Sequence, residues 1–320
     1  MLSRVADNLY WMSRHLERAE HILRLLDVNM GLMLDRSSTT AEGRWQRVIA
    51  AVGRPPGVTW TGDFQELANT LVFDTDIPSS VTSCIISARD NARQVRDEIS
   101  TEQWQQLNRI YHRVTEPQAK GDSYVSFSTF LPLVMDGVHL FQGITDTTMN
   151  HGEGWQFIQI GRYLERASAT ATLLDLHQTE TFSVYEDPSD GYQYLEWIGL
   201  LRSCTAFEAY CKVYTADLTH SRILEFLLLN REFPHSVRFS VDCLSQALLA
   251  IQHGRVSQPS DELMRVSGRL QASLNFVDIS EILSKDPVAY LRSIQHQCHQ
   301  VHDLIYKFYI LYSVQAALAL

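Results

Sequence analysis

Hydrophobic residues recur every three or four positions along the first 33 residues of the chain. This spacing places them on one stripe of a single long helix over residues 2–33. The stripe consists of Leu2, Val5, Leu9, Met12, Leu16, Ala19, Leu23, Leu26, Met30 and Met33. At about 100° per residue, the opposite side of this helix collects a second, polar and aromatic face. That face consists of Tyr10, Arg14, Glu17, Arg18 and His21.

The same arrangement returns in the second half of the chain. The sequence Arg-x-x-Glu-Arg-Ala that starts at Arg14 recurs at Arg162, and Leu-Leu-Asp recurs at the same offset, ending at Asp27 and at Asp175. The apolar stripe also recurs, as Phe157, Ile160, Leu164, Ala167, Ala171 and Leu174. Self-similarity of this kind predicts two related helical halves.

The remaining chain also has helical periodicity. Further helices are predicted over 41–52, 64–73, 80–99, 100–111, 123–149, 192–214, 221–230, 261–274, 277–283 and 287–318, with another opening at Phe233-Pro234. Ser100 and Gln103 form a capping box, and Pro132 predicts a kink. The sequence has no strand-like alternation and no glycine-rich phosphate loop.

We therefore predict an all-α fold, a large multi-helix bundle with two related halves. Each half is led by a long helix that carries the Arg-x-x-Glu-Arg-Ala motif. The halves are expected at about 1–150 and 151–320, sharing one core in a single domain over residues 1–320.

Composition narrows the class of protein. A hydrophobic fraction of 45% with 20% charged residues is typical of globular proteins, and a net charge of −10 disfavours nucleic acid as a partner. The cysteines are scattered without CxxC spacing, which favours a reducing cytoplasm. Charged residues interrupt the N-terminal helix, so a signal peptide is not expected, and the apolar run 309–320 is shorter than the roughly 20 residues of a membrane span.

The paired motifs are the first candidates for chemistry. Each places a carboxylate, Glu17 or Glu165, within one helical turn of two guanidinium groups, Arg14 and Arg18 or Arg162 and Arg166. One interpretation is a network of salt bridges that links the halves. The other is a shared pocket, in which the arginines hold a carboxylate or phosphate and a glutamate holds an amine or moves a proton.

A dimetal centre is a second hypothesis for paired glutamates in a helical bundle, because ferritin-like sites use Glu-x-x-His on two helices. Three residues beyond the motif glutamates stand Glu20 and Ser168, so this motif is absent. His21 has a ligand-compatible spacing, but the second copy has Ala169 there. We therefore predict no metal at the motifs and no cofactor.

A row of histidines near the C-terminus is a third candidate. His296, His299 and His302 follow one another at steps of three, with Cys298 nearby. Such a row is compatible with a metal site, but it is also typical of the polar face of a surface helix.

Polar residues elsewhere form a fourth group. Arg89 and Asn91 lie in a predicted helix, and Glu208 lies in the segment Ala-Phe-Glu-Ala-Tyr. They belong either to a solvated charged surface or to the pocket that would contain Glu17.

Several of these segments together resemble the bacterial alpha-E domain family, all-helical proteins named for recurrent glutamates. The segments are MLSRVADNLYWMSRHLERAEHILRLLDVN, ARDNARQVRDEIS with the following EQW, EGW with RYLERA, AFEAY, and EFLLLNREFPHSVRF. The resemblance covers nearly the whole chain. The chain departs from the family pattern at Asp90, where the family usually has glutamate, and in a less basic segment after Tyr210.

The resemblance implies partners rather than a reaction. Alpha-E proteins are encoded beside, or fused to, circularly permuted ATP-grasp ligases and transglutaminase-like peptidases, a context that implies formation or trimming of amide bonds. Three hypotheses follow: an accessory or binding subunit of such a system, an enzyme of amide or aminoacyl transfer that uses Glu17 or Glu165 as general base, and a purely structural helical scaffold. The sequence leaves the substrate and the oligomeric state open.

Overall fold

The computed structural model describes residues 2–32, 41–116, 127–184, 191–215, 217–253 and 261–311. The described residues form helices joined by turns and short connections, and none of them lies in a strand. The predicted all-α class is confirmed. The chain divides into two compact units, Ser3–Arg162 and the residues from Tyr163 onward. The boundary falls inside one long helix, α8 (Glu153–Val184).

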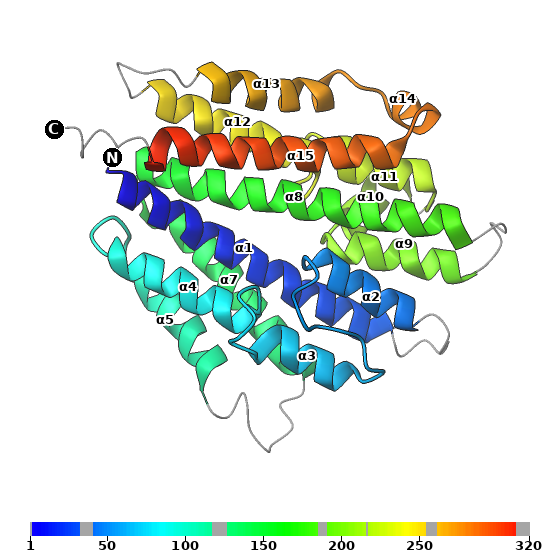
Figure 1. Ribbon diagram of the computed structural model, residues 1–320, viewed down its shortest axis with the longest axis horizontal. Coiled ribbons are helices and arrows are strands. Elements are labelled where there is room, and N and C mark those ends of the chain that lie inside the picture. The colour runs from blue at the N-terminus through cyan, green and yellow to red at the C-terminus, as the bar shows by residue number, and fades with distance from the viewer. Residues whose placement is uncertain are drawn as a thin grey trace. The chain divides into compact units, whose positions relative to one another are not determined.

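The first unit contains α1 and the helices that surround it (Figure 1). These are α1 (Ser3–Leu32), α2 (Ala41–Ala51), α3 (Phe64–Phe73), α4 (Val81–Gln94), α5 (Thr101–Thr115), α7 (Phe127–Thr148) and the start of α8. Helix α1 packs mainly against α4 and α7, and α5 packs against both of these. Residues 33–40 and 117–126, which include the predicted start of the helix over 123–149, lie outside the described residues.

The apolar stripe of α1 forms the core of this unit. Leu9, Met12, Leu16, Leu23 and Leu26 are each no more than 2% exposed. Burying a side chain of this size contributes about 1.5–3 kcal/mol relative to leaving it exposed. Other sides of α1 are covered as well, since Tyr10, Glu17 and Leu25 are also buried. The corresponding stripe of α8, from Phe157 to Leu174, is equally buried. The predicted seam of α8 is confirmed, and that of α1 is confirmed from Leu9 to Leu26. Leu2 is exposed, Val5 and Met30 are half-buried, and Met33 lies outside the described residues.

Local signals in the sequence explain where several helices begin. Asp63 caps α3 by accepting a hydrogen bond from the Gln65 amide at 2.8 Å. Ser100 and Gln103 form the predicted reciprocal capping box at the start of α5. Pro132 lies inside α7. Each cap satisfies backbone groups that a helix end leaves without partners.

The start of α8 touches α1 backbone to backbone at Gly161. A Cβ atom on this residue would overlap the Tyr10 carbonyl oxygen and the Ser13 hydroxyl. Gly161 directly precedes Arg162, just as Ser13 directly precedes Arg14. A small residue therefore stands immediately before the motif in both copies, and in the first unit it allows the two helices to come this close.

The second unit is also helical. It contains the rest of α8, α9 (Gly191–Ser203), α10 (Phe207–Tyr214), α11 (His220–Leu229), α12 (Val237–His253), α13 (Asp261–Asn275), α14 (Ile279–Ser284) and α15 (Pro287–Ile305), followed by the π-helical η2 (Tyr306–Leu311). Helix α13 packs against α12 and α15, while α11 packs against α12, α14 and α9.

Four predicted helix boundaries are wrong. The helix over 192–214 is broken because Thr205 adopts a left-handed conformation with φ of 54°. Helix α12 begins at Val237 rather than at Phe233, because the Ser236 hydroxyl caps it by accepting from the Phe239 amide at 3.1 Å. Helix α4 ends at Gln94 rather than at 99, where the Val95 amide turns back to the Ala92 carbonyl.

The last of the four is α15, which ends at Ile305 and passes into the wider turn of η2. Residues 312–318 of its predicted range lie outside the described residues.

Candidate functional site

Two carboxylates are buried one turn apart on α1. Glu17 is 5% exposed and Glu20 is 2% exposed. Taking a carboxylate out of water costs several kcal/mol unless hydrogen bonds or opposite charges compensate. The neighbours of these two groups therefore decide what this part of the molecule can do.

Helix α7 and the next turn of α1 supply those neighbours. The Gln142 side-chain amide donates to Glu17 Oε2 at 3.3 Å, and His139 Nε2 lies 3.0 Å from Glu20 Oε1. Arg24, one turn along α1, donates to the same Glu20 oxygen at 2.9 Å. His139, Gln142 and Asp146 follow one another at helical spacing, so they share one face of α7.

His139 connects this buried region to solvent. Its side chain is 46% exposed, whereas the Glu20 carboxylate that it contacts is 3% exposed. The hydrogen bond with Glu20 raises the pKa of the His139 imidazole above its ordinary value, while burial opposes the shift. The pair thus places a half-exposed imidazole against a buried carboxylate.

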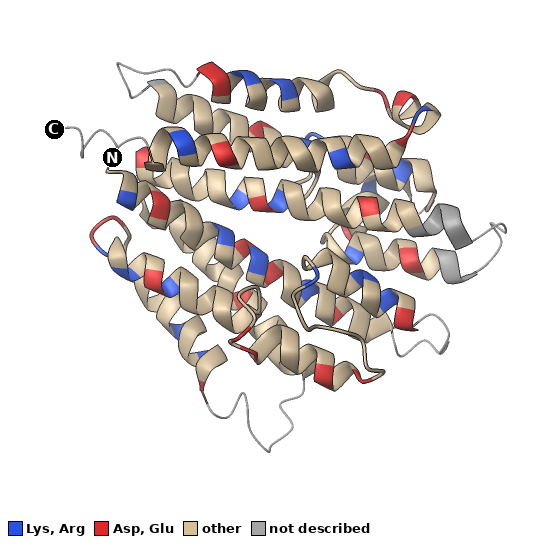
Figure 2. Cartoon of the chain, in the orientation of Figure 1, with Lys and Arg blue, Asp and Glu red and all other residues tan. Residues whose placement is uncertain are grey.

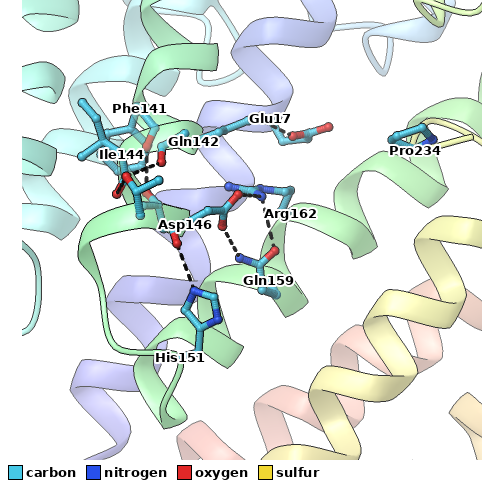
Figure 3. A network of polar contacts seen from close by, with 12 residues as sticks. Glu17, Phe141, Gln142, Ile144, Asp146, His151, Gln159, Arg162 and Pro234 are labelled. Carbon is cyan, nitrogen blue, oxygen red and sulfur yellow. Dashed lines mark hydrogen bonds and ion pairs between the residues drawn. The ribbon is translucent and has the colours of Figure 1, made fainter.

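Arg162, from the second motif, also belongs to the first unit. Figure 3 shows its side chain beside those of Asp146 and Gln159. Its Nη1 atom lies 3.3 Å from Gln159 Oε1 and 3.6 Å from Asp146 Oδ2. Gln159 in turn donates to Asp146 Oδ1 at 3.3 Å, and His151 Nε2 lies 3.1 Å from the Asp146 carbonyl oxygen. Arg162 is only 7% exposed, and these partners offset the cost of burying its charge.

Three sets of contacts, each with a residue from one face of α7, make up what we call the polar layer of the first unit. The polar layer consists of Glu17, Glu20, His139, Gln142, Asp146, Gln159 and Arg162. The sequence analysis singled out Glu17 and Arg162 but missed the other members as site residues. The helical spacing of His139, Gln142 and Asp146 could have indicated these α7 residues from the sequence.

The other motif residues of α1 have different surroundings. Arg14 donates to the Tyr10 hydroxyl at 3.0 Å and lies over the Trp11 ring at 4.8 Å. Tyr10 is fully buried, and Arg18 is half-buried. Arg14 is therefore held beside aromatic rings, which suit a guanidinium face.

The rest of the second motif lies in the second unit. Glu165 is 9% exposed and Arg166 is 7% exposed. Arg166 Nη1 donates to the Pro234 carbonyl oxygen at 3.3 Å and lies 5.6 Å from the centre of the Tyr163 ring. One turn further, the Thr170 hydroxyl donates to the His235 carbonyl at 3.1 Å. This face of α8 thus fastens the turn that precedes α12.

Acidic and basic residues lie next to one another along both α1 and α8 (Figure 2).

The remaining predicted site residues are dispersed. Arg89 faces α5, where its Nε donates to Asn108 Oδ1 at 2.7 Å, and Asn91 is half-buried on the same α4. Glu208 is exposed on α10 of the second unit. These contacts differ from those of Glu17, which accepts a hydrogen bond from Gln142 of α7.

The predicted histidine row lies on α15. His296 and His299 are exposed and His302 is half-buried against Tyr306. Across the part of the chain that the structure describes, no three His, Cys, Asp or Glu side chains are grouped so that they could hold a metal ion. The same part of the chain contains no helix both long and apolar enough to cross a membrane.

The chain contains two Glu-Arg pairs, Glu17-Arg18 and Glu165-Arg166. Residues 1–310 match the Alpha-E family, described as a predicted alpha-helical domain with a conserved ER motif. Uncharacterized proteins from Mycobacterium bovis and Mycobacterium tuberculosis are 24% identical over 261 residues, which is 75% of this chain but 29% of theirs. The chain thus spans less than a third of the length of these relatives. No solved structure gives a significant match. The chain belongs to the Alpha-E family.

Proposed function

We propose that this protein is an accessory, non-catalytic subunit of an amide-bond-forming system built around a circularly permuted ATP-grasp ligase. In this proposal the polar layer of the first unit holds the amine-bearing acceptor, a peptide or an amino acid. The observation that carries the proposal is the burial of Glu17 and Glu20 one turn apart on the motif helix, with His139 reaching from Glu20 to solvent.

The chemistry of the polar layer supports this assignment. Buried carboxylates are strong acceptors for an ammonium group, and a buried guanidinium such as Arg162 binds a carboxylate through its planar fork. An amino acid or peptide end carries both of these groups. The length of the relatives also supports the proposal, since a domain that makes up 29% of a longer protein is placed to act together with other domains.

The test is an amide-forming assay with purified components. The ATP-grasp partner is incubated with ATP and candidate amine acceptors, with and without this protein, and the amide product is measured by mass spectrometry. We expect product from the partner, more product when this protein is added, and none from this protein alone. Product from this protein alone, without ATP, would overturn the accessory role and support the second hypothesis, a general base at Glu17 or Glu165.

A structural role is the second candidate function, and one observation favours it. Arg162, Asp146 and Gln159 satisfy one another in a closed set of contacts, as a purely structural network would. If that role were the only one, substitutions in the polar layer would lower the free energy of unfolding and leave the partner's product yield unchanged once the variants were folded.

A transglutaminase-like protein is a further partner that the family resemblance suggests. Its addition to the same assay is expected to change which amides accumulate, since such enzymes cleave or exchange amide bonds.

A further inference from the structure

Arginine and aromatic side chains alternate in a stack between α4 and α5 of the first unit. The Arg89 guanidinium carbon lies 4.3 Å from the centre of the Tyr111 ring and 5.4 Å from that of Trp104. The Arg96 guanidinium carbon lies 5.6 Å from the same Trp104 ring. We call Arg89, Arg96, Trp104, Asn108 and Tyr111 the Arg–aromatic ladder. All five residues are half-buried, so each keeps part of its surface in solvent.

Hydrogen bonds fix the orientation of Arg89 within the ladder. Its Nε donates to Asn108 Oδ1 at 2.7 Å, and the Asn108 amide nitrogen donates to the Trp104 carbonyl at 2.9 Å. The Arg89 guanidinium group lies over the Tyr111 and Trp104 rings, and Asn108 holds its Nε. The two Nη groups are left as the edge of the fork that can receive a ligand.

The ladder arginines form no direct ion pair with the acids around them in the described ranges. Within the described ranges, neither Arg89 nor Arg96 has a carboxylate within ion-pair distance, although the chain as a whole carries a net charge of −10. Arg93, on the same helix, is paired with Asp90 at 3.4 Å. Asp97, Glu98 and Glu102 are exposed in the adjoining α4–α5 connection and first turn of α5. Arg96 Nη1 donates to the Ile99 carbonyl oxygen at 3.3 Å. The Nη groups of Arg89 and the rest of the Arg96 guanidinium group therefore remain available to an outside anion.

We propose that the Arg–aromatic ladder docks an acidic peptide segment of a partner protein. Its carboxylates would be held by the Nη groups of Arg89 and by Arg96, and its backbone would lie against Trp104. Both guanidinium carbons lie within 5.6 Å of one ring centre. Alternate side chains of an extended peptide are roughly 7 Å apart, so two acidic residues on one side of such a peptide can reach both arginines.

General properties of interfaces support this occupant. Tryptophan, tyrosine and arginine are the residues most enriched where binding energy concentrates, and a pre-ordered guanidinium loses little conformational entropy when it binds a carboxylate bidentately. A nucleic acid is disfavoured as occupant, because two arginines are too few to neutralise the several phosphates that such a ligand presents. This docking surface is separate from the polar layer, and the inference does not rest on the proposed function.

Binding of a dye-labelled hexaglutamate peptide, measured by fluorescence anisotropy at low salt, tests the inference. Hexaglutamine serves as the uncharged peptide and a short oligodeoxythymidine as the nucleic acid. The double variant Arg89→Gln with Arg96→Gln is compared with Arg265→Gln with Arg269→Gln, which removes the same charge from exposed positions of α13. We expect the ladder variant to bind hexaglutamate at least about tenfold more weakly, and the matched variant to stay within about twofold of the wild type.

A second pair of variants covers the case in which the ladder variant does not fold, as judged by circular dichroism. Arg89→Lys with Arg96→Lys keeps the charge but loses the planar fork, and it is expected to weaken peptide binding by about threefold or more. Equal binding by wild type and the ladder variants would overturn the inference. So would equal affinity for hexaglutamine, or tighter binding of the oligonucleotide than of hexaglutamate.

Discussion

The two copies of the Arg-x-x-Glu-Arg-Ala motif have nearly the same residues and very different surroundings. In the first copy, Glu17 accepts from a side chain of α7, and the neighbouring Glu20 is bonded to Arg24 and to the half-exposed His139. In the second copy, Arg166 is bonded to a backbone carbonyl in the turn before α12. Next to the first copy, Glu20 contacts two ionisable side chains. In the second copy, Arg162 lies near Asp146 and Arg166 binds the backbone.

The aspartates that follow the two motifs repeat this contrast. Burial raises the pKa of the Asp27 carboxyl, and the positive charge of Arg24 only partly opposes this effect. The matching Asp175 accepts from Arg292 at 3.3 Å and from Gln295 at 3.2 Å, both on α15. Asp27 thus lies in a partly buried region beside Arg24, whereas Asp175 joins α8 to α15 through its hydrogen bonds. Identical residues at matching positions thus have different partners according to what packs against them.

The largest expected effect is at Gly161. Replacing it by alanine forces a Cβ against the Tyr10 carbonyl and Ser13, so we expect a loss of about 3 kcal/mol in the free energy of unfolding. Gly268 in α13 has nothing within 4 Å of such a Cβ. Gly268→Ala should therefore stabilise the protein by roughly 0.5–1 kcal/mol. Urea unfolding measures both, and an equal response of the two glycines would contradict the close contact.

The second effect concerns the structural copy. Arg166→Met removes the bond to the Pro234 carbonyl and the contact with the Tyr163 ring, at a cost of about 2 kcal/mol, since bonds to charged groups contribute about 1.5–3 kcal/mol. The exposed Arg269 on α13 is the control, and Arg269→Met should change stability by less than about 0.5 kcal/mol. Equal unfolding midpoints for the two variants would show that Arg166 does not fasten the turn before α12.

The third effect concerns the first copy. Glu17→Gln keeps the size and shape of the side chain and removes a buried charge, so we expect a change in unfolding free energy of less than about 1 kcal/mol in either direction. Glu102→Gln, at an exposed position of α5, is the matched control. A loss of several kcal/mol at Glu17 alone would mean that this copy is structural as well.

The smallest effect is a dependence on pH. Because the pKa of His139 is raised in the folded protein, its contribution to stability is complete below the unfolded value of about 6.5 and is lost as pH rises through the folded value. With a half-exposed side chain, this contribution is below about 1 kcal/mol. Titration of His139 by NMR should show a lower pKa in Glu20→Gln than in the wild type. An unchanged pKa would remove Glu20 as the cause.

Periodicity in the sequence was enough to predict the fold class, the buried stripe and the long motif helices, because these depend on residues three or four positions apart. The capping box at Ser100 and Gln103 was predictable for the same reason. The partners of the motif were not, since His139 lies 119 positions from Glu20 and Gln142 lies 125 positions from Glu17. Only packing of α7 against α1 brings them together. The break at Thr205 was missed because a left-handed threonine is unfavourable and has no simple local signal.

The rate of amide formation by the proposed ATP-grasp partner in the presence of Glu17→Gln tests most directly whether the first copy binds a ligand. We predict a stimulation at least about tenfold weaker than with the wild-type protein, at a melting temperature within about 2 °C of the wild type, while Glu102→Gln stimulates fully. Full stimulation by folded Glu17→Gln would contradict the account.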